Sequence, residues 1–296
     1  MNVLDRDKQI AIIAALCDGL GIRATARVVG VNRGTVAALA MRVGQGCAEL
    51  HHRTMIGLQV SRLELDELWS YIGRKRRKHE KPDPVSEKGD AYTFVALAAS
   101  SRAIVSYCTG RRDGATTDAF IHDLSQRVTG NPEISTDGYM PYKPAIRDAF
   151  GKRASHGMIT KTYSVTHLAV TEASRRYSPA QVIKVTRDVV SGVPEYISTS
   201  YVERSHLTLR MTIKRFARLT LGYSKSLDHH LAAVSLYVSF YNLCRVHESL
   251  RCTPAMALGV ADRVWTIGDL LDAALATDPT VPAGKPQLRV IEGGRS

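Results

Sequence analysis

The sequence has no arrangement of cysteines that would build a disulfide framework or a cysteine-rich zinc site. Its five cysteines are scattered, and no CxxC pair occurs. It also has no run of about 18 apolar residues, which predicts that no segment spans a membrane. The first residues, MNVLDRDKQ, lack the apolar core of a signal peptide. Together these absences indicate a protein of a reducing cytoplasm.

Acidic residues are too few to balance the basic ones. The 296 residues include 28 Asp and Glu against 40 Lys and Arg, which gives a formal net charge of +12. Basic proteins attract polyanions because neutralised phosphates release counterions, so we expect a nucleic-acid partner. A basic protein with no nucleic-acid role is the alternative. The hydrophobic fraction of 44% allows a sizeable core, in one large domain or in two to three smaller ones.

Residues 4–44 have the pattern of three short helices, the last two matching a helix-turn-helix over Ile22–Val43. Ala26 is small where the two helices must approach closely, and Gly30 suits a turn that needs positive φ. Asn32 is a good N-cap for the second helix. An ordinary helical hairpin is the alternative, and a polar stretch at 46–54 is expected to link this unit to the rest. The side chains predicted to face DNA are Arg33, Thr35 and Arg42.

From residue 60 the pattern predicts three strands, a helix, a strand and a second helix, followed by two long helices. The first strand, Val60–Tyr71, alternates, with Leu63 and Leu65 on one face and Glu64 and Asp66 on the other. This order of elements is that of the RNase H-like fold. Residues 157–198 give no clear assignment as a whole, although 158–164 and 181–185 look extended. The other predicted elements are strands 92–99, 104–108 and 133–136, and helices 118–128, 142–150, 201–219 and 226–244.

Three acidic residues lie in distinctive contexts on separate elements: Asp66 in LELDELW, Asp137 in ISTDGY and Glu203 in YVERSHLTLR. Two lie in or at the end of predicted strands and the third lies on a predicted helix, as the active-site acids of the RNase H-like fold do. Three such carboxylates can hold two magnesium ions, which activate a water or hydroxyl and stabilise the leaving oxygen of a phosphodiester. Glu64 is the alternative ligand, whereas Glu67 is expected to point to the opposite strand face.

Two basic segments are predicted to contact DNA. At 100° per residue, Glu203, Arg210 and Lys214 fall on one stripe of the predicted helix, so an acid that holds metal would be followed by cations that meet phosphates. A solvated cationic face, with the acid favoured by the helix dipole, is the alternative. The second segment, RKRRKHEK, is an exposed loop for which a merely solvated hairpin is the alternative. The predicted contacts are Arg74, Lys75, Arg76, Arg77, Arg204, Arg210 and Lys214.

Three motifs stand in a fixed order: DELW at 66–69, TDGY at 136–139 and ERSHLTLR at 203–210. With these motifs the chain resembles the DDE transposases of the insertion-sequence-one-like group of bacteria. A later segment, YNLCRVHESLRCTPAMA at 241–257, is similar to segments that close several transposase and integrase catalytic domains. The resemblance covers about Leu63 to Val264, and the order and completeness of the motifs make it specific.

The resemblance implies that Asp66, Asp137 and Glu203 are the catalytic metal ligands and that two magnesium ions bind, with manganese able to replace them. Arg210 matches the basic position that follows the helix acid in this family. The chain departs from the family in two respects. No zinc-binding cysteine cluster precedes the helix-turn-helix, and the longer gap between the second and third acids implies an insertion at 144–194.

The leading hypothesis is therefore an α/β protein that transposes DNA. It would have an all-α helix-turn-helix domain at 1–55, an RNase H-like catalytic domain at 60–264, and a C-terminal helix and loose tail at 265–296. It would bind the terminal inverted repeats of an insertion sequence and transfer a 3′-hydroxyl into target DNA. Because two ends must be joined, its partners would be double-stranded DNA and at least a second copy of itself. A DNA-binding regulator, and a nuclease that cuts without joining, are the alternatives.

Overall fold

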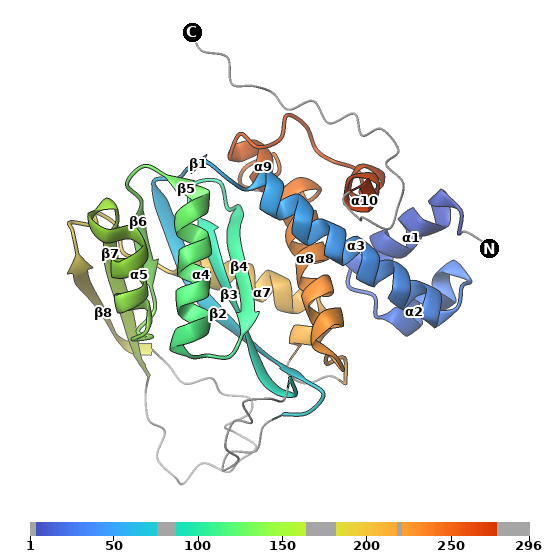
Figure 1. The fold of residues 1–296 in the computed structure, drawn as a ribbon, viewed down its shortest axis with the longest axis horizontal. Coiled ribbons are helices and arrows are strands. Elements are labelled where there is room, and N and C mark those ends of the chain that lie inside the picture. Colours follow the sequence, from blue (N-terminus) through green and yellow to red (C-terminus); the bar gives the residue numbers. More distant parts are fainter. Residues whose placement is uncertain (1–3, 76–86, 164–181, 218–220, 277–296) are drawn as a thin grey trace.

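The computed structural model describes residues 4–75, 87–163, 182–217 and 221–276. Its centre is a six-stranded mixed sheet with the order β4–β3–β2–β6–β7–β8 (Figure 1). The three strands from β2 to β4 pair antiparallel, β6 and β7 run parallel to β2, and β8 returns antiparallel to β7. The strands are β2 (Arg62–Ile72), β3 (Gly89–Ala98), β4 (Ile104–Gly110), β6 (Glu133–Thr136), β7 (Ser155–Tyr163) and β8 (Val182–Ser191), with a separate parallel pair, β1 (Leu58–Gln59) and β5 (Val128–Thr129).

Helices cover both faces of this sheet. On one face lie α4 (Gly114–Arg127) and α5 (Tyr142–Phe150), and on the other lie α7 (Ser200–Thr212) and α8 (Leu227–Leu243) (Figure 1). The alternation predicted for β2 is confirmed, because Leu63 and Leu65 join the core beneath α4 and α5. Leu68 joins the second core, with Val202 of α7. The predicted order of strands and helices from residue 60 is confirmed as well.

The amino-terminal residues form α1 (Arg6–Cys17), α2 (Ile22–Val29) and α3 (Arg33–Thr54). Gly30 ends α2 in the left-handed region at φ 72°, and the Asn32 side chain accepts the N–H of Gly34 at 2.7 Å. These local features of the predicted turn are present. The expected link at 46–54 is wrong, because α3 continues without a break to Thr54 and packs along α8 and α10 (Ile267–Ala276). The predicted domain limits at 55, 60 and 264 stay predictions.

A second correction concerns the helix that carries Glu203. The predicted helix at 201–219 ends at Thr212, because Ile213 is extended at φ −107° and ψ 109°, and a short 3-10 turn, η2 (Lys214–Phe216), follows. Lys214 therefore does not continue the helical stripe of Glu203 and Arg210. Ile213 and Phe216 still pack in the core beneath α7.

The region left unassigned at 157–198 contributes β7 and β8, which widen the sheet beyond β6. It falls largely within the segment expected to be an insertion, of which residues 164–181 lie outside the described residues. The remaining short elements are η1 (Gly151–Arg153) and α9 (Pro254–Ala257). Among the helices that the structure describes, none is both long and apolar enough to cross a membrane.

Glycines let α3 approach its neighbours closely, and this gives a test of the helix packing. A Cβ at Gly44 would overlap the backbone oxygen of Ala232 in α8. We expect Gly44→Ala to lower the free energy of unfolding by about 1–3 kcal/mol, because overpacking outweighs the better helix propensity of alanine. Urea denaturation measures this, and Gln45→Ala on the exposed side of α3 is the control. Equal stability of Gly44→Ala and the wild type would contradict the close packing.

Candidate active site

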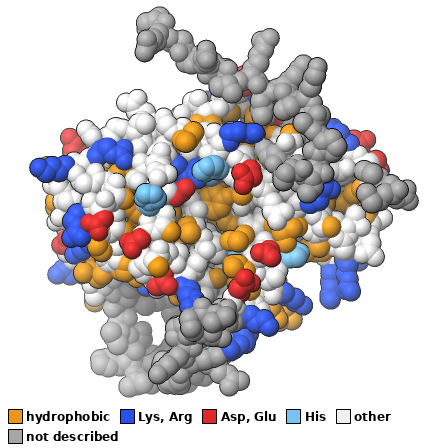
Figure 2. Space-filling model, in the orientation of Figure 1, with side chains coloured by type: hydrophobic (Ala, Val, Ile, Leu, Met, Phe, Trp, Pro, Cys, Tyr) orange, Lys and Arg blue, Asp and Glu red, His pale blue; other side chains and the backbone are white. Residues whose placement is uncertain are grey.

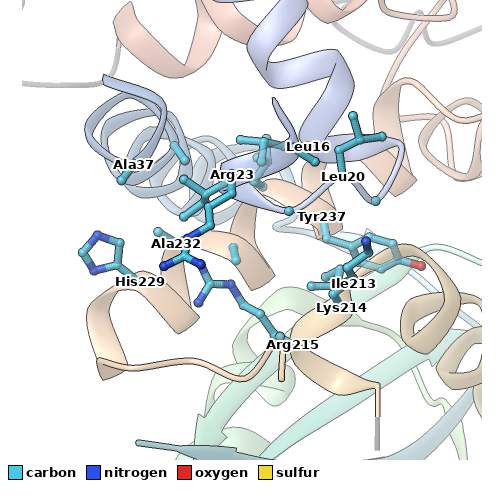
Figure 3. A pocket seen from close by; sticks show the side chains of 18 of the residues that line it. Leu16, Leu20, Arg23, Ala37, Ile213, Lys214, Arg215, His229, Ala232 and Tyr237 are labelled. Atoms are coloured by element: carbon cyan, nitrogen blue, oxygen red, sulfur yellow. The ribbon is translucent and has the colours of Figure 1, made fainter. Parts of the chain in front are cut away.

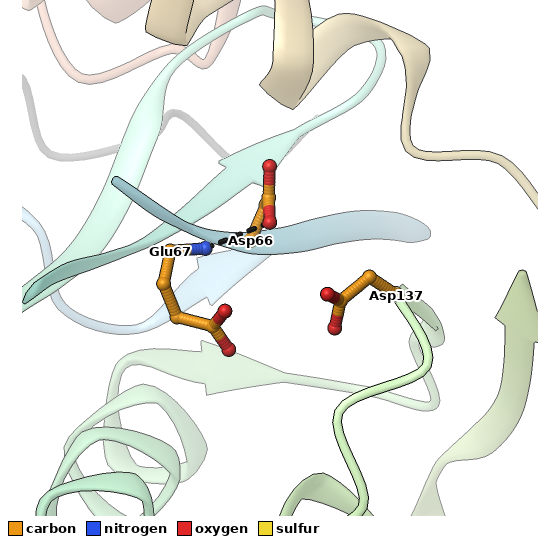
Figure 4. A group of neighbouring side chains, drawn as sticks. All are labelled: Asp66, Glu67 and Asp137. Atoms are coloured by element: carbon orange, nitrogen blue, oxygen red, sulfur yellow. Dashed lines mark hydrogen bonds between the residues drawn. The ribbon is translucent and has the colours of Figure 1, made fainter. Parts of the chain in front are cut away.

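Asp66 lies on β2, and Asp137 directly follows the neighbouring parallel strand β6. Leu65 of β2 pairs with Thr136 at the end of β6, and the residue that follows each of them is an aspartate. Asp137 begins a tight turn, in which its Oδ1 accepts the N–H of Tyr139 at 3.0 Å. Asp66 Oδ1 accepts the N–H of Glu67 at 2.9 Å (Figure 4). The strand pairing therefore brings together two of the three predicted acids.

Glu67 completes a group of three carboxylates. One oxygen each from Asp66, Glu67 and Asp137 lies within 4.8 Å of the others. Figure 4 shows Asp66 and Glu67 leaving β2 in opposite directions, as strand alternation predicts. Sequence reasoning placed Glu67 away from the site, but its longer side chain curves beneath the strand, toward the end of β6. The adjacent pair of acids in DELW was the one signal that could have indicated it.

Burial and the crowding of negative charge raise the pKa values of Glu67 and Asp137. The Glu67 side chain is only 3% exposed, and burial, followed by the charge of Asp137, raises its pKa to about 7. Burial also raises the pKa of Asp137, helped by the charges of Asp66 and Glu203, although the Tyr139 N–H and Arg112 oppose it. Carboxylates that resist ionisation in the absence of a cation are expected where a cation is to bind.

Arg112, in the loop between β4 and α4, was not predicted and contacts two of the three carboxylates. Its Nε lies 3.3 Å from Glu67 Oε2 and its Nη2 lies 3.7 Å from Asp137 Oδ2. Burial alone would lower the pKa of Arg112, but the charges of Glu67 and Asp137 raise it overall. Its guanidinium stacks on the ring of Tyr139, with 4.0 Å from its carbon to the ring centroid. Tyr139 therefore has a packing role at this site.

His206 of α7 holds the other aspartate. Its Nδ1 lies 3.2 Å from Asp66 Oδ2, and its side chain is 4% exposed. With a proton on Nδ1, His206 donates to Asp66 and fixes the orientation of the carboxylate, as outer partners of metal ligands commonly do. This contact crosses from α7 to β2 and therefore also fixes the helix against the strand.

Glu203 lies in the first turn of α7 but outside the group of three carboxylates. Its Oε1 accepts hydrogen bonds from Lys161 of β7, as an ion pair, and from the hydroxyl of Thr199 at 2.7 Å. The Glu203 charge is nevertheless close enough to raise the pKa of Asp137. Lys161 comes from the region that gave no assignment, and the sequence offered no signal for this pairing.

Glu64, the alternative ligand, has a different role in the structure. Its Oε2 accepts the N–H groups of Tyr201 at 2.7 Å and of Val202 at 3.0 Å, at the amino terminus of α7. Burial raises the pKa of Glu64, and these two donors oppose the rise. A carboxylate here satisfies N–H groups that have no partner within the helix and faces the positive end of the helix dipole. Glu64 thus anchors α7 to β2.

The residues fit a hard divalent cation. All three members of the group offer carboxylate oxygens, which magnesium and manganese prefer. Glu67 Oε1 is buried and makes no hydrogen bond of ordinary geometry to any described residue, although the Tyr142 hydroxyl lies close enough to oppose the rise in the pKa of Glu67. A buried carboxylate oxygen without a partner is costly, and a metal ion would remove that cost. Asp66 and Asp137 would hold the ion, with Glu67 or Glu203 completing its ligands.

The predicted DNA-binding residues are dispersed. Most are exposed at the surface, and on the face in Figure 2 basic side chains lie at several places, interspersed with acidic ones. Lys75 lies over the rings of Trp69 and Tyr71, at 5.2 and 5.5 Å from the centroids, and these aromatics also pack against each other. Arg76 and Arg77 lie outside the described residues. The exposed ones are Arg33, Thr35, Arg42, Arg74, Lys75, Arg204 and Lys214, whereas Arg210 is half-buried.

Solved structures similar to this chain include a piggyBac transposase synaptic complex with hairpin DNA, at a TM-score of 0.42 and 10% identity, covering 94% of this chain and 72% of that one. The Mos1 transposase paired-end complex with the left transposon end has a TM-score of 0.22 and 14% identity, covering 51% and 57%. A pre-cleavage Mos1 transpososome gives 0.30 and 11%, covering 94% and 80%. No family model and no curated protein matches the sequence. The scores are low, so the proposal below rests on the site itself.

The raised pKa of Glu67 makes stability depend on pH. Its pKa is about 7 in the folded protein against an ordinary 4.5, so the folded state binds the proton more tightly. The protonated Glu67 side chain therefore contributes up to about 3 kcal/mol to the free energy of unfolding. This contribution is fully present below pH 4.5 and is lost as the pH rises through 7. In EDTA, Glu67→Gln should remove this loss and be the more stable protein at pH 8. Urea denaturation from pH 4.5 to 8 tests this, with exposed Glu49→Gln as control; parallel curves for Glu67→Gln and wild type would refute it.

Proposed function

We propose that this protein is a metal-dependent DNA transposase of the DDE class, related to the insertion-sequence-one-like group of bacteria, with an RNase H-like catalytic domain. The observation that carries the proposal is the meeting of Asp66, within β2, and Asp137, directly after the parallel strand β6, beside the helix that bears Glu203. The sheet order, three antiparallel strands followed by two parallel ones, supports the assignment of the catalytic fold.

The chain's own residues prepare the site for phosphodiester chemistry. Asp66, Asp137 and Glu203 would hold two divalent ions, magnesium or manganese, and Glu67 is the fourth carboxylate within reach. When bound, such ions lower the pKa of an attacking oxygen and neutralise the leaving one. His206 orients Asp66, and Arg112 balances the charges of Glu67 and Asp137. Arg204 and Arg210, on the same helix as Glu203, would position DNA phosphates.

The partners of the proposed reaction are two DNA ends and a target. The amino-terminal helices α2 and α3 would recognise terminal inverted repeats as a helix-turn-helix, with Arg33, Thr35 and Arg42 at the DNA. Gly30 in the turn and Asn32 as the cap support this proposal. The freed 3′-hydroxyl would attack target DNA directly, with no covalent enzyme intermediate. Because both ends are joined in one event, at least two copies of the chain would assemble on DNA.

A strand-transfer assay with magnesium tests the proposed function. Its substrates are pre-cut DNA ends taken from the repeats that flank this gene. Wild type should give joined product, and Asp66→Asn, Asp137→Asn and Glu203→Gln should each lower it more than about 100-fold, because each removes a metal ligand. Exposed Asp118→Asn on α4 is the control and should remain active. Asp137→Asn should still bind the ends.

The same assay separates the proposal from its alternatives. End binding without cleavage or joining in any divalent metal would indicate a regulator. Cleavage without joining would indicate a nuclease. Full activity of Glu203→Gln together with loss of activity in Glu67→Gln would show that Glu67, and not Glu203, is the third catalytic acid.

A further inference from the structure

A cavity of about 870 Å³ lies between the amino-terminal helices and the residues that follow α7 (Figure 3). Helices α1, α2 and α3 form one side of it, and η2 and α8 form the other. Its volume falls within the roughly 300–1,000 Å³ of pockets that hold small organic groups. The carboxylates of the candidate active site are not among its lining residues.

Positive charge predominates among the described residues that line this cavity. Among its described lining residues are five Lys or Arg and no Asp or Glu. The side chains of Arg23 and Arg215 extend toward the same part of the cavity from opposite sides (Figure 3). Two like charges that face one cavity repel each other unless an anion lies between them. The five are Arg23, Arg27, Lys214, Arg215 and Lys225.

Arg215 is the most informative of these cations. Within the described part of the chain it pairs with no carboxylate; its Nη1 donates to the hydroxyl of Ser224 at 3.1 Å. Ser224 in turn contacts His230 at 2.7 Å, and burial and the charge of Arg215 lower the pKa of His230 to about 4. Burial lowers the pKa of Arg215. A largely buried guanidinium without a counter-charge is costly, and an anionic ligand would offset that cost.

The other walls are apolar. Leu16, Leu20 and Ala37 line the cavity from the amino-terminal helices, and Ala233 and Leu236 line it from α8. Tyr237 also lines it, and its buried hydroxyl makes no hydrogen bond to any described residue. Apolar walls beside several cations suit a ligand with a flat, mostly apolar ring and a phosphate, which is the chemistry of a nucleotide.

The cavity adjoins the carboxyl end of α7, whose amino end carries Glu203. Nine residues of helix separate Glu203 from Thr212, about 14 Å along the axis. At roughly 3.4 Å per nucleotide step, a DNA strand at the active site would reach the cavity about four nucleotides from the reacting phosphate. A base taken out of the stack there would fix the register of the strand.

We propose that this cavity binds an unpaired nucleotide of the DNA strand, with its base between the apolar walls and its phosphate on Arg215 and Arg23. The inference rests on the proposed function, from which it takes DNA as the nucleic acid that is bound. A free nucleotide has the same chemistry, and the experiment below distinguishes the two sources.

The test compares binding of duplexes with and without unpaired nucleotides, by fluorescence anisotropy in EDTA. Wild type should bind a duplex with a four-nucleotide overhang, at its 3′ or its 5′ end, about tenfold more tightly than the blunt duplex. Ala233→Trp, which fills the cavity, and Arg215→Gln, which removes its buried cation, should bring that ratio near one. Lys152→Gln, at an exposed position in η1, removes a charge elsewhere and should keep the ratio.

Circular dichroism and unchanged affinity for the blunt duplex show that the variants are folded. A folded Ala233→Trp that keeps the full overhang preference would overturn the proposal. So would deoxyadenosine monophosphate binding in the cavity while wild type shows no overhang preference, because the pocket would then belong to free nucleotides. The experiment needs no metal and no strand cleavage, so a negative result would not contradict the proposed reaction. Conversely, binding to the overhang can be measured even if the protein shows no strand transfer.

Discussion

The contact between Glu64 and the amino terminus of α7 determines where the third acid lies. One carboxylate oxygen of a buried strand residue accepts the first free N–H groups of the helix. Asp66 follows two residues later on the same strand face, and Glu203 follows within the first turn of the same helix. The helix end therefore cannot shift relative to β2 without leaving a buried carboxylate unpaired, which costs far more than a surface contact. Glu64 thus shapes the site by fixing the start of α7 against β2.

The site holds four carboxylates, and each has a cationic or hydrogen-bonding partner. Arg112 contacts Glu67 and Asp137, His206 contacts Asp66, and Lys161 contacts Glu203. These partners stabilise a cluster of negative charge that would otherwise repel itself apart. The partner of Glu203 is the flexible ammonium of Lys161. A metal ion bound by all three predicted ligands would take the place of Lys161 at the Glu203 carboxylate.

The sequence allowed the local elements of this fold to be predicted, but not the contacts between distant ones. Strand β6 and helix α5 lie at their predicted residues because alternation and helical spacing are local. Strand β8 was predicted only in part, at 181–185, because nearly all of its side chains are exposed and no apolar alternation marks its full length. The length of α3 was missed because the polar stretch at 46–54 suggested a linker, whereas its glycines permit close contact of the helix with α8 and α10. Arg112 and Lys161 reach their acids across 45 and 42 residues, and no local pattern marks such a pairing.

The central claim is that Asp66, Asp137 and Glu203 hold divalent metal together. A crystal structure with manganese, using anomalous diffraction to locate the ions, tests it most directly. The account predicts anomalous peaks in contact with both aspartates and with Glu203, whose carboxylate has turned away from Lys161. Manganese held by Asp66, Glu67 and Asp137 while Glu203 stays on Lys161, or no peak at these carboxylates, would contradict it.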